Sequence, residues 1–172
     1  MDAFVVKNKD GFSLQIGHLV HMMDYARFTT LRAVRNLTTK QLDCIHDAES
    51  NSIGALLAHI AAVEWFYQIY TFESREPSRE EYQPWSAAMD LGDKAKAEIK
   101  GHSLKYYTNL LDAVRQKTLE GFASRNDQWL YDEKPFRNEK LANHYFMWFH
   151  VFEDEINHRG QIRWLRKRLP KL

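Results

Sequence analysis

Glycine and proline are scarce in this chain, and long apolar runs are absent. The 172 residues include 7 glycines and 4 prolines, so few positions interrupt a helix. Apolar residues instead recur at helical spacing along most of the chain. These features predict an all-α fold rather than a sheet, and the length fits one domain spanning residues 1–172.

Cysteine and net charge are also nearly missing. Cys44 is the single cysteine, so no internal disulfide can form. Lys and Arg total 24 against 23 Asp and Glu, a formal net charge of +1, which gives no general attraction for nucleic acid or an anionic membrane. The N-terminus lacks the apolar run of a secretory signal, and no segment approaches the ~20 apolar residues of a membrane span. We therefore expect a soluble, cytoplasmic protein that binds neither nucleic acid nor membrane.

Four segments carry apolar residues at helical spacing, and we predict that each forms a long helix. Four helices of such length can cover one another's apolar faces, which predicts a four-helix bundle. On the first helix, Arg27, Arg32 and Arg35 are expected to face solvent. The predicted helices run approximately from Ser13 to Asn36, from Ser50 or Ser52 to Tyr70, from Ser103 to Ala123, and from near Leu141 through Gln161.

The connections between these helices differ in character. Thr38 and Gln41 have the spacing of a capping box, which predicts a short extra helical piece after the first helix. Residues 73–85 are charged, carry two prolines and show no helical period, so we predict the longest loop there and the rim of any pocket. Residues Arg125 to Arg137 form the connection to the last helix.

Three side chains with metal-binding chemistry interrupt apolar helix faces. Asp154 and His158 are four residues apart, so both lie on one face of the last helix. An ionised carboxylate on a buried face needs a partner, hydrogen bonds or a metal. His59 interrupts the apolar face of the second helix in the same way. If these helices are neighbours, two imidazoles and one carboxylate meet, a donor set that binds zinc, nickel, iron or manganese.

An interpretation of these residues without a metal also fits their spacing. Asp154 and His158 can form a buried ion pair, clamped by Arg163 or by a hydroxyl. A lone histidine on an apolar helix face is more often a hydrogen-bonded core residue than a ligand. The spacing alone leaves both readings open.

Two stretches carry a resemblance to a known family. Leu56–Trp65 contains His59, and Glu153–Ile162 contains the sequence His-Arg-Gly-Gln. Together with Leu37–Leu42 they resemble the DinB/YfiT-like family of bacterial four-helix metalloproteins. The resemblance implies a bundle of DinB-like topology that holds nickel, zinc or a similar divalent ion with three histidines. His59 and His158 match two of those positions, whereas Asp154 stands where the family usually has its remaining histidine.

This departure bears on the ligand set. Compared with histidine, aspartate is a shorter, harder and negatively charged ligand, which favours metal ions that accept oxygen ligands. His150 is the alternative ligand, although it lies two turns before His158 and is rotated by about 80° from it. Glu155 is a candidate ligand partner or proton acceptor, with a solvated helix face as the simpler reading. Arg159 and Gln161 are expected to orient ligands or to make packing hydrogen bonds.

Two functions follow from these residues. The first is a metal-dependent enzyme of unknown small-molecule substrate, which the resemblance implies is of hydrolase or thiol-transferase type. No nucleophilic serine, cysteine or phosphate loop is apparent, so the ion must carry the reaction. The alternative is a non-catalytic dimeric bundle with a relic or structural metal site.

A homodimer is expected in either case, because the last helix has more apolar surface than one bundle face can bury. Either the extra turns after Thr38 or another subunit would cover it. The aromatic residues that provide this surface are Tyr145, Trp148, Phe149 and Phe152.

Overall fold

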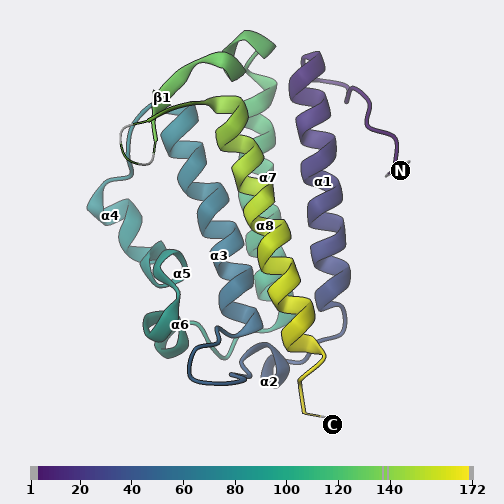
Figure 1. Cartoon of the computed structure of the whole chain (residues 1–172), viewed down its shortest axis with the longest axis vertical. Helices are drawn as coiled ribbons and strands as arrows, with labels where there is room; N and C mark the ends of the chain where they lie inside the picture. The colour runs from purple at the N-terminus through teal and green to yellow at the C-terminus, as the bar shows by residue number, and fades with distance from the viewer. Residues whose placement is uncertain (1–3, 137, 139, 171–172) are drawn as a thin grey trace.

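The chain is mostly helical, as predicted. The computed structural model describes residues 4–136, 138 and 140–170. Four long helices lie side by side along the longest axis of the molecule (Figure 1). They are α1 (Leu14–Val34), α3 (Ile53–Tyr67), α7 (Leu104–Ala123) and α8 (His144–Arg166).

The long helices pair in both relative directions. Helices α1 and α8 run parallel, since Arg27 bonds to Glu155 and, farther along both helices, Arg166 bonds to the Ala33 carbonyl. Helices α3 and α7 are also parallel, as the contacts Glu64–Arg115 and Gln68–Thr118 show. In contrast, α3 and α8 are antiparallel, because Thr71 contacts Trp148 whereas His59 contacts Asp154. Because α3 and α7 are successive long helices that run parallel, the chain has to cross the length of the molecule between them, and residues 68–103 provide that crossing.

Serine and asparagine side chains begin three of the long helices. Ser52, Ser103 and Asn143 each accept a hydrogen bond from a backbone N–H in the first turn of α3, α7 and α8. Helix α1 is different, because the side chain of Ser13 makes no such bond. Asp127 takes its place from elsewhere in the chain and accepts hydrogen bonds from the backbone N–H groups of residues 15 and 16.

The connection after α1 agrees with its prediction, and the one after α3 does not. Thr38 and Gln41 form the predicted capping box at the start of α2 (Thr39–Leu42). Helix α3 continues as a π-helical turn (Gln68–Phe72). The segment 73–85, predicted to be a loop, contains α4 (Arg79–Tyr82) and a 3₁₀ turn (Gln83–Trp85). A capping box formed by Ser78 and Glu81 starts α4. Its spacing is visible in the sequence, but the charged composition of the segment favoured the prediction of a loop. Two further helices follow, α5 (Ser86–Asp90) and α6 (Gly92–Glu98).

A small hairpin precedes the last helix. After a 3₁₀ turn (Asp127–Tyr131), strand β1 (Glu133–Pro135) pairs antiparallel with β2 (Leu141–Asn143), with Lys134 opposite Ala142. Helix α8 therefore begins at His144 rather than near Leu141, because residues 141–143 hydrogen-bond to β1 and Asn143 caps the helix. The end of the predicted connection, Arg137, lies outside the described residues.

The buried apolar residues form two clusters, one toward each end of the long helices. One cluster includes Leu57 and Leu111, and the other includes Met23 and Trp148. Across residues 4–136, 138 and 140–170, no helix combines the length and apolar character required to cross a membrane.

The predictions of what surrounds Arg27, Trp148 and Phe152 were wrong. Arg27 is only 6% exposed, because charged side chains from other helices surround its guanidinium. Trp148 and Phe152 are buried in the chain's own core, where Trp148 stacks on Phe72. Helix α2 does not cover the aromatic part of α8, since it lies at the opposite end of the molecule (Figure 1).

Candidate metal centre

His59, Asp154 and His158 lie together between α3 and α8. His59 comes from the middle of α3, and the other two are one turn apart on α8. One ligand atom from each residue falls within 4.8 Å of those of the other two. In the described part of the chain, this is the one group of three or more His, Cys, Asp or Glu side chains so placed. The predicted meeting of the three side chains is therefore present in the structure.

The spacing of these atoms fits a shared ion. Asp154 Oδ2 lies 3.7 Å from His59 Nε2, and Asp154 Oδ1 lies 3.4 Å from His158 Nε2. The two imidazole centroids are 4.7 Å apart. Two donors that bind one ion at ~2.1 Å in tetrahedral geometry are separated by about 3.4 Å. The three side chains thus need little movement to bind a single cation.

The backbone of α5 selects which nitrogen of His59 is available. His59 Nδ1 lies 2.8 Å from the carbonyl oxygen of Ala88. A carbonyl only accepts hydrogen bonds, so Nδ1 carries the proton and Nε2 keeps its lone pair. Such a bond to the non-coordinating nitrogen is the usual way in which proteins orient a metal-binding histidine. Burial lowers the pKa of His59 and so favours the neutral imidazole that a cation requires.

Asp154 and His158 interact strongly with each other. Burial alone would raise the pKa of Asp154, but the hydrogen bond and charge of His158 outweigh it and lower that pKa. Burial likewise opposes the protonated form of His158, yet Asp154 raises its pKa above the ordinary value. The predicted pairing of Asp154 with His158 is therefore present, although without a clamp from Arg163, which instead lines a groove with Ala33 and Lys167.

The pair leaves buried polar atoms without hydrogen bonds. These are Asp154 Oδ2, which points toward His59, and His158 Nδ1. The side chains of His59, Asp154 and His158 are 13%, 19% and 13% exposed, so the group is accessible from solvent but mostly enclosed. An unsatisfied carboxylate oxygen beside a neutral imidazole is a favourable place for a cation. The residues present therefore fit a divalent ion.

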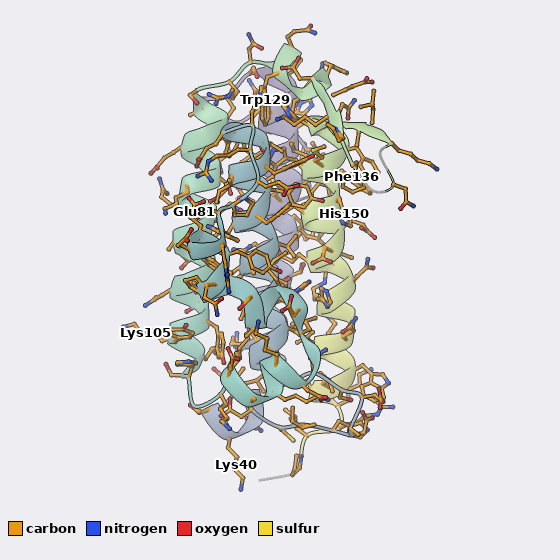
Figure 2. The ribbon with its side chains drawn as sticks, turned by 90° about the vertical axis from the view of Figure 1, so that its left-hand side faces the viewer. Lys40, Glu81, Lys105, Trp129, Phe136 and His150 are labelled. Carbon is orange, nitrogen blue, oxygen red and sulfur yellow. The ribbon has the colours of Figure 1, made fainter. Side chains whose placement is uncertain are left out.

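His150, the alternative ligand, does not join the group. Its Nδ1 lies 3.0 Å from Glu153 Oε2, and its ring contacts Phe136, Phe146 and Tyr67. Figure 2 shows His150 on α8 just below Phe136, which follows β1. The rotation between His150 and His158 places the His150 ring among these aromatic side chains instead of at the candidate site.

Glu155 was predicted to lie on a solvated face, and this was wrong. It is 1% exposed and bonds to Arg27, with Oε1 3.1 Å from Nε. Arg159 points toward α1, where it donates to the Thr29 hydroxyl. Neither side chain is among the group of potential ligands.

Gln161 lies one turn beyond His158 and contributes to the rise in the pKa of that imidazole. It also lines a cavity of about 460 Å³ between residues 49–51 and the end of α8. Trp164 and Leu165 form the wall next to Gln161. Open space is therefore present within about two helical turns of His158.

Comparison with known proteins assigns the family. The family model described as mycothiol-S-transferase matches residues 18–170. The chain belongs to the mycothiol-S-transferase family. This family is DinB/YfiT-like, so the resemblance in the sequence is confirmed.

A structural comparison agrees at the level of the fold. A crystal structure of a conserved protein from Enterococcus faecalis superposes with a TM-score of 0.67 at 17% sequence identity. The match covers 88% of this chain and 94% of the other. No curated protein sequence matches the chain. The structural match therefore supports the arrangement of helices, whereas the mycothiol-S-transferase match supports a thiol-transferase type of function.

Sequence patterns missed several residues around the candidate centre. The Ala88 carbonyl that orients His59 has no side-chain signal, because any residue supplies a carbonyl. Glu64, Arg27 and Arg115 form buried ion pairs behind the site. Glu64 did have a detectable signal, since it is the one charged residue within the otherwise apolar α3.

Proposed function

We propose that this protein is a metal-dependent thiol transferase with a divalent ion held by His59, Asp154 and His158. The observation that carries the proposal is the spacing of 3.4 Å and 3.7 Å from the two Asp154 oxygens to the two imidazole nitrogens. Family membership favours transfer of a thiol over hydrolysis. Two imidazoles and one carboxylate leave coordination positions open to a substrate.

The chain itself supplies no sulfur nucleophile at this centre. Cys44 is the single cysteine, and its Sγ lies near the carbonyl of Ile45 rather than among the candidate ligands. The reacting thiol must therefore come from a small molecule. A divalent ion, when bound, supplies the positive charge that lowers the pKa of a thiol and so makes its thiolate available at neutral pH.

The protein's residues orient and neutralise this charge. Ala88 fixes the ring of His59, and Asp154 supplies one negative charge against the two positive charges of the ion. In the proposed reaction the thiol loses its proton to solvent, its sulfur forms a bond to an electrophilic carbon, and that carbon loses its leaving group as an anion. The cavity beyond Gln161 offers space for the remainder of the thiol.

The experiment combines metal analysis with an activity assay. Protein purified without chelator or affinity tag is analysed for zinc, nickel, iron and manganese, and is then incubated with monochlorobimane and mycothiol, with glutathione as the comparison thiol. We expect about one bound ion per chain and bimane conjugation above the uncatalysed rate, both lost in His59→Ala. A folded protein that neither carries nor takes up metal would overturn the proposal and favour the non-catalytic dimeric bundle.

The same family membership supports further proposals about the whole molecule. We infer that the four long helices form one domain, a four-helix bundle of DinB-like topology, in a cytoplasmic protein. We also propose a homodimer through the outer face of α1 and α8. Large apolar side chains remain exposed on this face, including Tyr25, Phe28, Phe149 and Ile156. Exposed apolar patches on a protein surface often mark protein–protein contacts.

A further inference from the structure

Four buried charged residues meet at one level of the molecule, and each comes from a different long helix. They are Arg27 of α1, Glu64 of α3, Arg115 of α7 and Glu155 of α8, and each is at most 7% exposed. Arg27 lies 2.8 Å from Glu64 and 3.1 Å from Glu155. Arg115 lies 2.7 Å from Glu64. We call these four residues the charge cluster.

The charge cluster separates the two apolar clusters of the core. On α3, for example, Ala62 belongs to one apolar cluster and Val63 to the other, and Glu64 follows directly. On α8, Glu155 falls between Phe152 of one apolar cluster and Ile162 of the other. This is also the level of the candidate metal centre. Glu155 follows Asp154 directly, and Glu64 is about 1.4 helical turns from His59.

A contribution to folding stability does not by itself account for the charge cluster. Removing charges from water is costly, and apolar residues of similar volume often replace a buried ion pair without loss of stability. Some polar atoms of the cluster also lack hydrogen bonds, namely Arg115 Nη1 and Glu155 Oε2. The nearest approach of Arg115 to Glu155 is 3.8 Å, longer than a hydrogen bond. A feature retained only for stability would be expected to satisfy these atoms.

The interactions within the charge cluster depend on direction, whereas the apolar contacts on either side of it do not. Apolar contacts depend on area rather than angle, so they resist sliding and rotation of a helix only weakly. Hydrogen bonds between charged groups require defined distances and angles. Rotation of α8 by one residue would turn Asp154 by about 100° away from His59. Buried polar contacts have their best-supported role in fixing such registers.

We propose that the charge cluster fixes the rotation and register of α3 against α8 so that His59 meets Asp154 and His158. Its members are thus positioning residues for the metal centre. The inference rests on the proposed function only in assuming that the three side chains bind a cation.

Paired substitutions on either side of Asp154 test this inference. Glu155 belongs to the charge cluster, whereas Glu153 lies 39% exposed and bonds to His150 and Asn157. Both Glu155→Gln and Glu153→Gln remove one negative charge next to Asp154 and keep the side-chain shape. The probe is Co²⁺, followed by its visible absorption spectrum and by titration. We expect Co²⁺ affinity to fall about tenfold or more in Glu155→Gln, with an altered spectrum, and to change less than twofold in Glu153→Gln.

A double variant that removes one positive and one negative charge distinguishes an effect on ligand position from an effect on folding stability. Arg27→Met/Glu155→Met removes one charge of each sign and leaves the Glu64–Arg115 pair intact. We expect cooperative unfolding to persist, while Co²⁺ affinity falls about tenfold and the spectrum broadens. Leu130→Ala is the control, since Leu130 is fully buried outside the charge cluster and its loss destabilises the core without reaching the ligands. Its Co²⁺ affinity should stay within twofold of the parent value.

The outcomes separate this inference from the proposed function. Equal losses in Glu155→Gln and Glu153→Gln would show an effect of charge alone and would overturn the positioning role. A folded Arg27→Met/Glu155→Met protein with parental affinity and spectrum would overturn it as well. Failure of the parent protein to bind Co²⁺ would instead reject the metal centre itself, before any variant is compared.

Discussion

Asp154 holds its carboxylate between two imidazoles, with His59 Nε2 3.7 Å from Oδ2 although the two residues lie on antiparallel helices separated in the chain by α4–α7. This relationship gives a carboxylate with one buried oxygen that lacks a hydrogen bond and a histidine whose Nε2 keeps its lone pair. It also makes Asp154 the residue on which the ligand set can best be tested.

Substitution of Asp154 should change metal binding in two opposite directions. Asp154→Ala removes a donor and leaves two imidazoles, so metal content and melting temperature should fall together. Asp154→His supplies a third imidazole and should raise affinity for zinc or nickel, which suit nitrogen donors. Metal content is measured by mass spectrometry and affinity by competition with a chromophoric chelator. Identical metal content in the parent protein and both variants would show that Asp154 is not a ligand.

His150→Ala should leave metal binding intact. The His150 side chain bonds to Glu153 and lies against Phe146, outside the group of three potential ligands. We expect metal content to match the parent protein and unfolding free energy to fall by about 1 kcal/mol through lost packing and hydrogen bonding. Loss of the metal in this variant, with the fold retained, would move the centre toward His150.

Glu64 should control stability in acid. Burial alone would raise its pKa, but the charges and hydrogen bonds of Arg115 and Arg27 lower that pKa from 4.5 to about 2. Because the folded-state pKa is depressed, the stabilisation is complete above pH ~4.5 and is lost as the pH falls toward 2. The change amounts to about 3 kcal/mol.

The measurement is urea unfolding of the parent protein and of Glu64→Gln at several pH values from 2 to 7. The variant should be less stable at neutral pH, because two buried arginines lose an anionic partner. Its stability should also change less between pH 4.5 and 2. If the unfolding free energy of Glu64→Gln fell as steeply between pH 4.5 and 2 as that of the parent protein, the acid sensitivity would belong to other carboxylates.

Asp127→Ala should destabilise the start of α1. Its carboxylate accepts hydrogen bonds from the Gln15 and Ile16 backbone and from the Ser13 hydroxyl. Loss of a comparable helix cap costs about 1 kcal/mol, which chemical denaturation can measure. Asp112→Ala is the control, because Asp112 lies exposed on α7 and should change stability by less than about 0.5 kcal/mol. Equal effects of the two substitutions would mean that Asp127 does not act as a cap.

A charged residue on the outer face of α8 should dissociate the proposed dimer. Phe149 is 44% exposed near Phe146 and Phe152, so Phe149→Glu would place a carboxylate within the apolar face. Sedimentation velocity at micromolar concentration should show dimer for the parent protein and monomer for the variant. Tyr106→Glu on α7 serves as the control and should remain dimeric. A parent protein that sediments only as monomer would reject the dimer itself.

Local patterns were sufficient for the long helices and for the candidate ligands. The i, i+4 spacing of Asp154 and His158 placed them on one face, and the apolar stripe around His59 pointed it inward. The capping box of Thr38 and Gln41 also formed as predicted, because both of its hydrogen bonds are made within one turn. Where a feature depends on neighbours a few residues away, the sequence by itself determined it.

Contacts between distant segments were decided only by the tertiary structure. Within their own helices, Arg27 and Glu155 resemble solvent-facing charges. They are buried because Glu64 of α3 and Arg115 of α7 pack against them and neutralise their charges. The cap on α1 comes from Asp127, and the orientation of His59 comes from a carbonyl of α5. Each of these interactions joins groups that the chain brings together only on folding, so no local spacing encodes it. The sequence thus supplied the chemistry of the centre, and the packing of four helices decided which groups surround it.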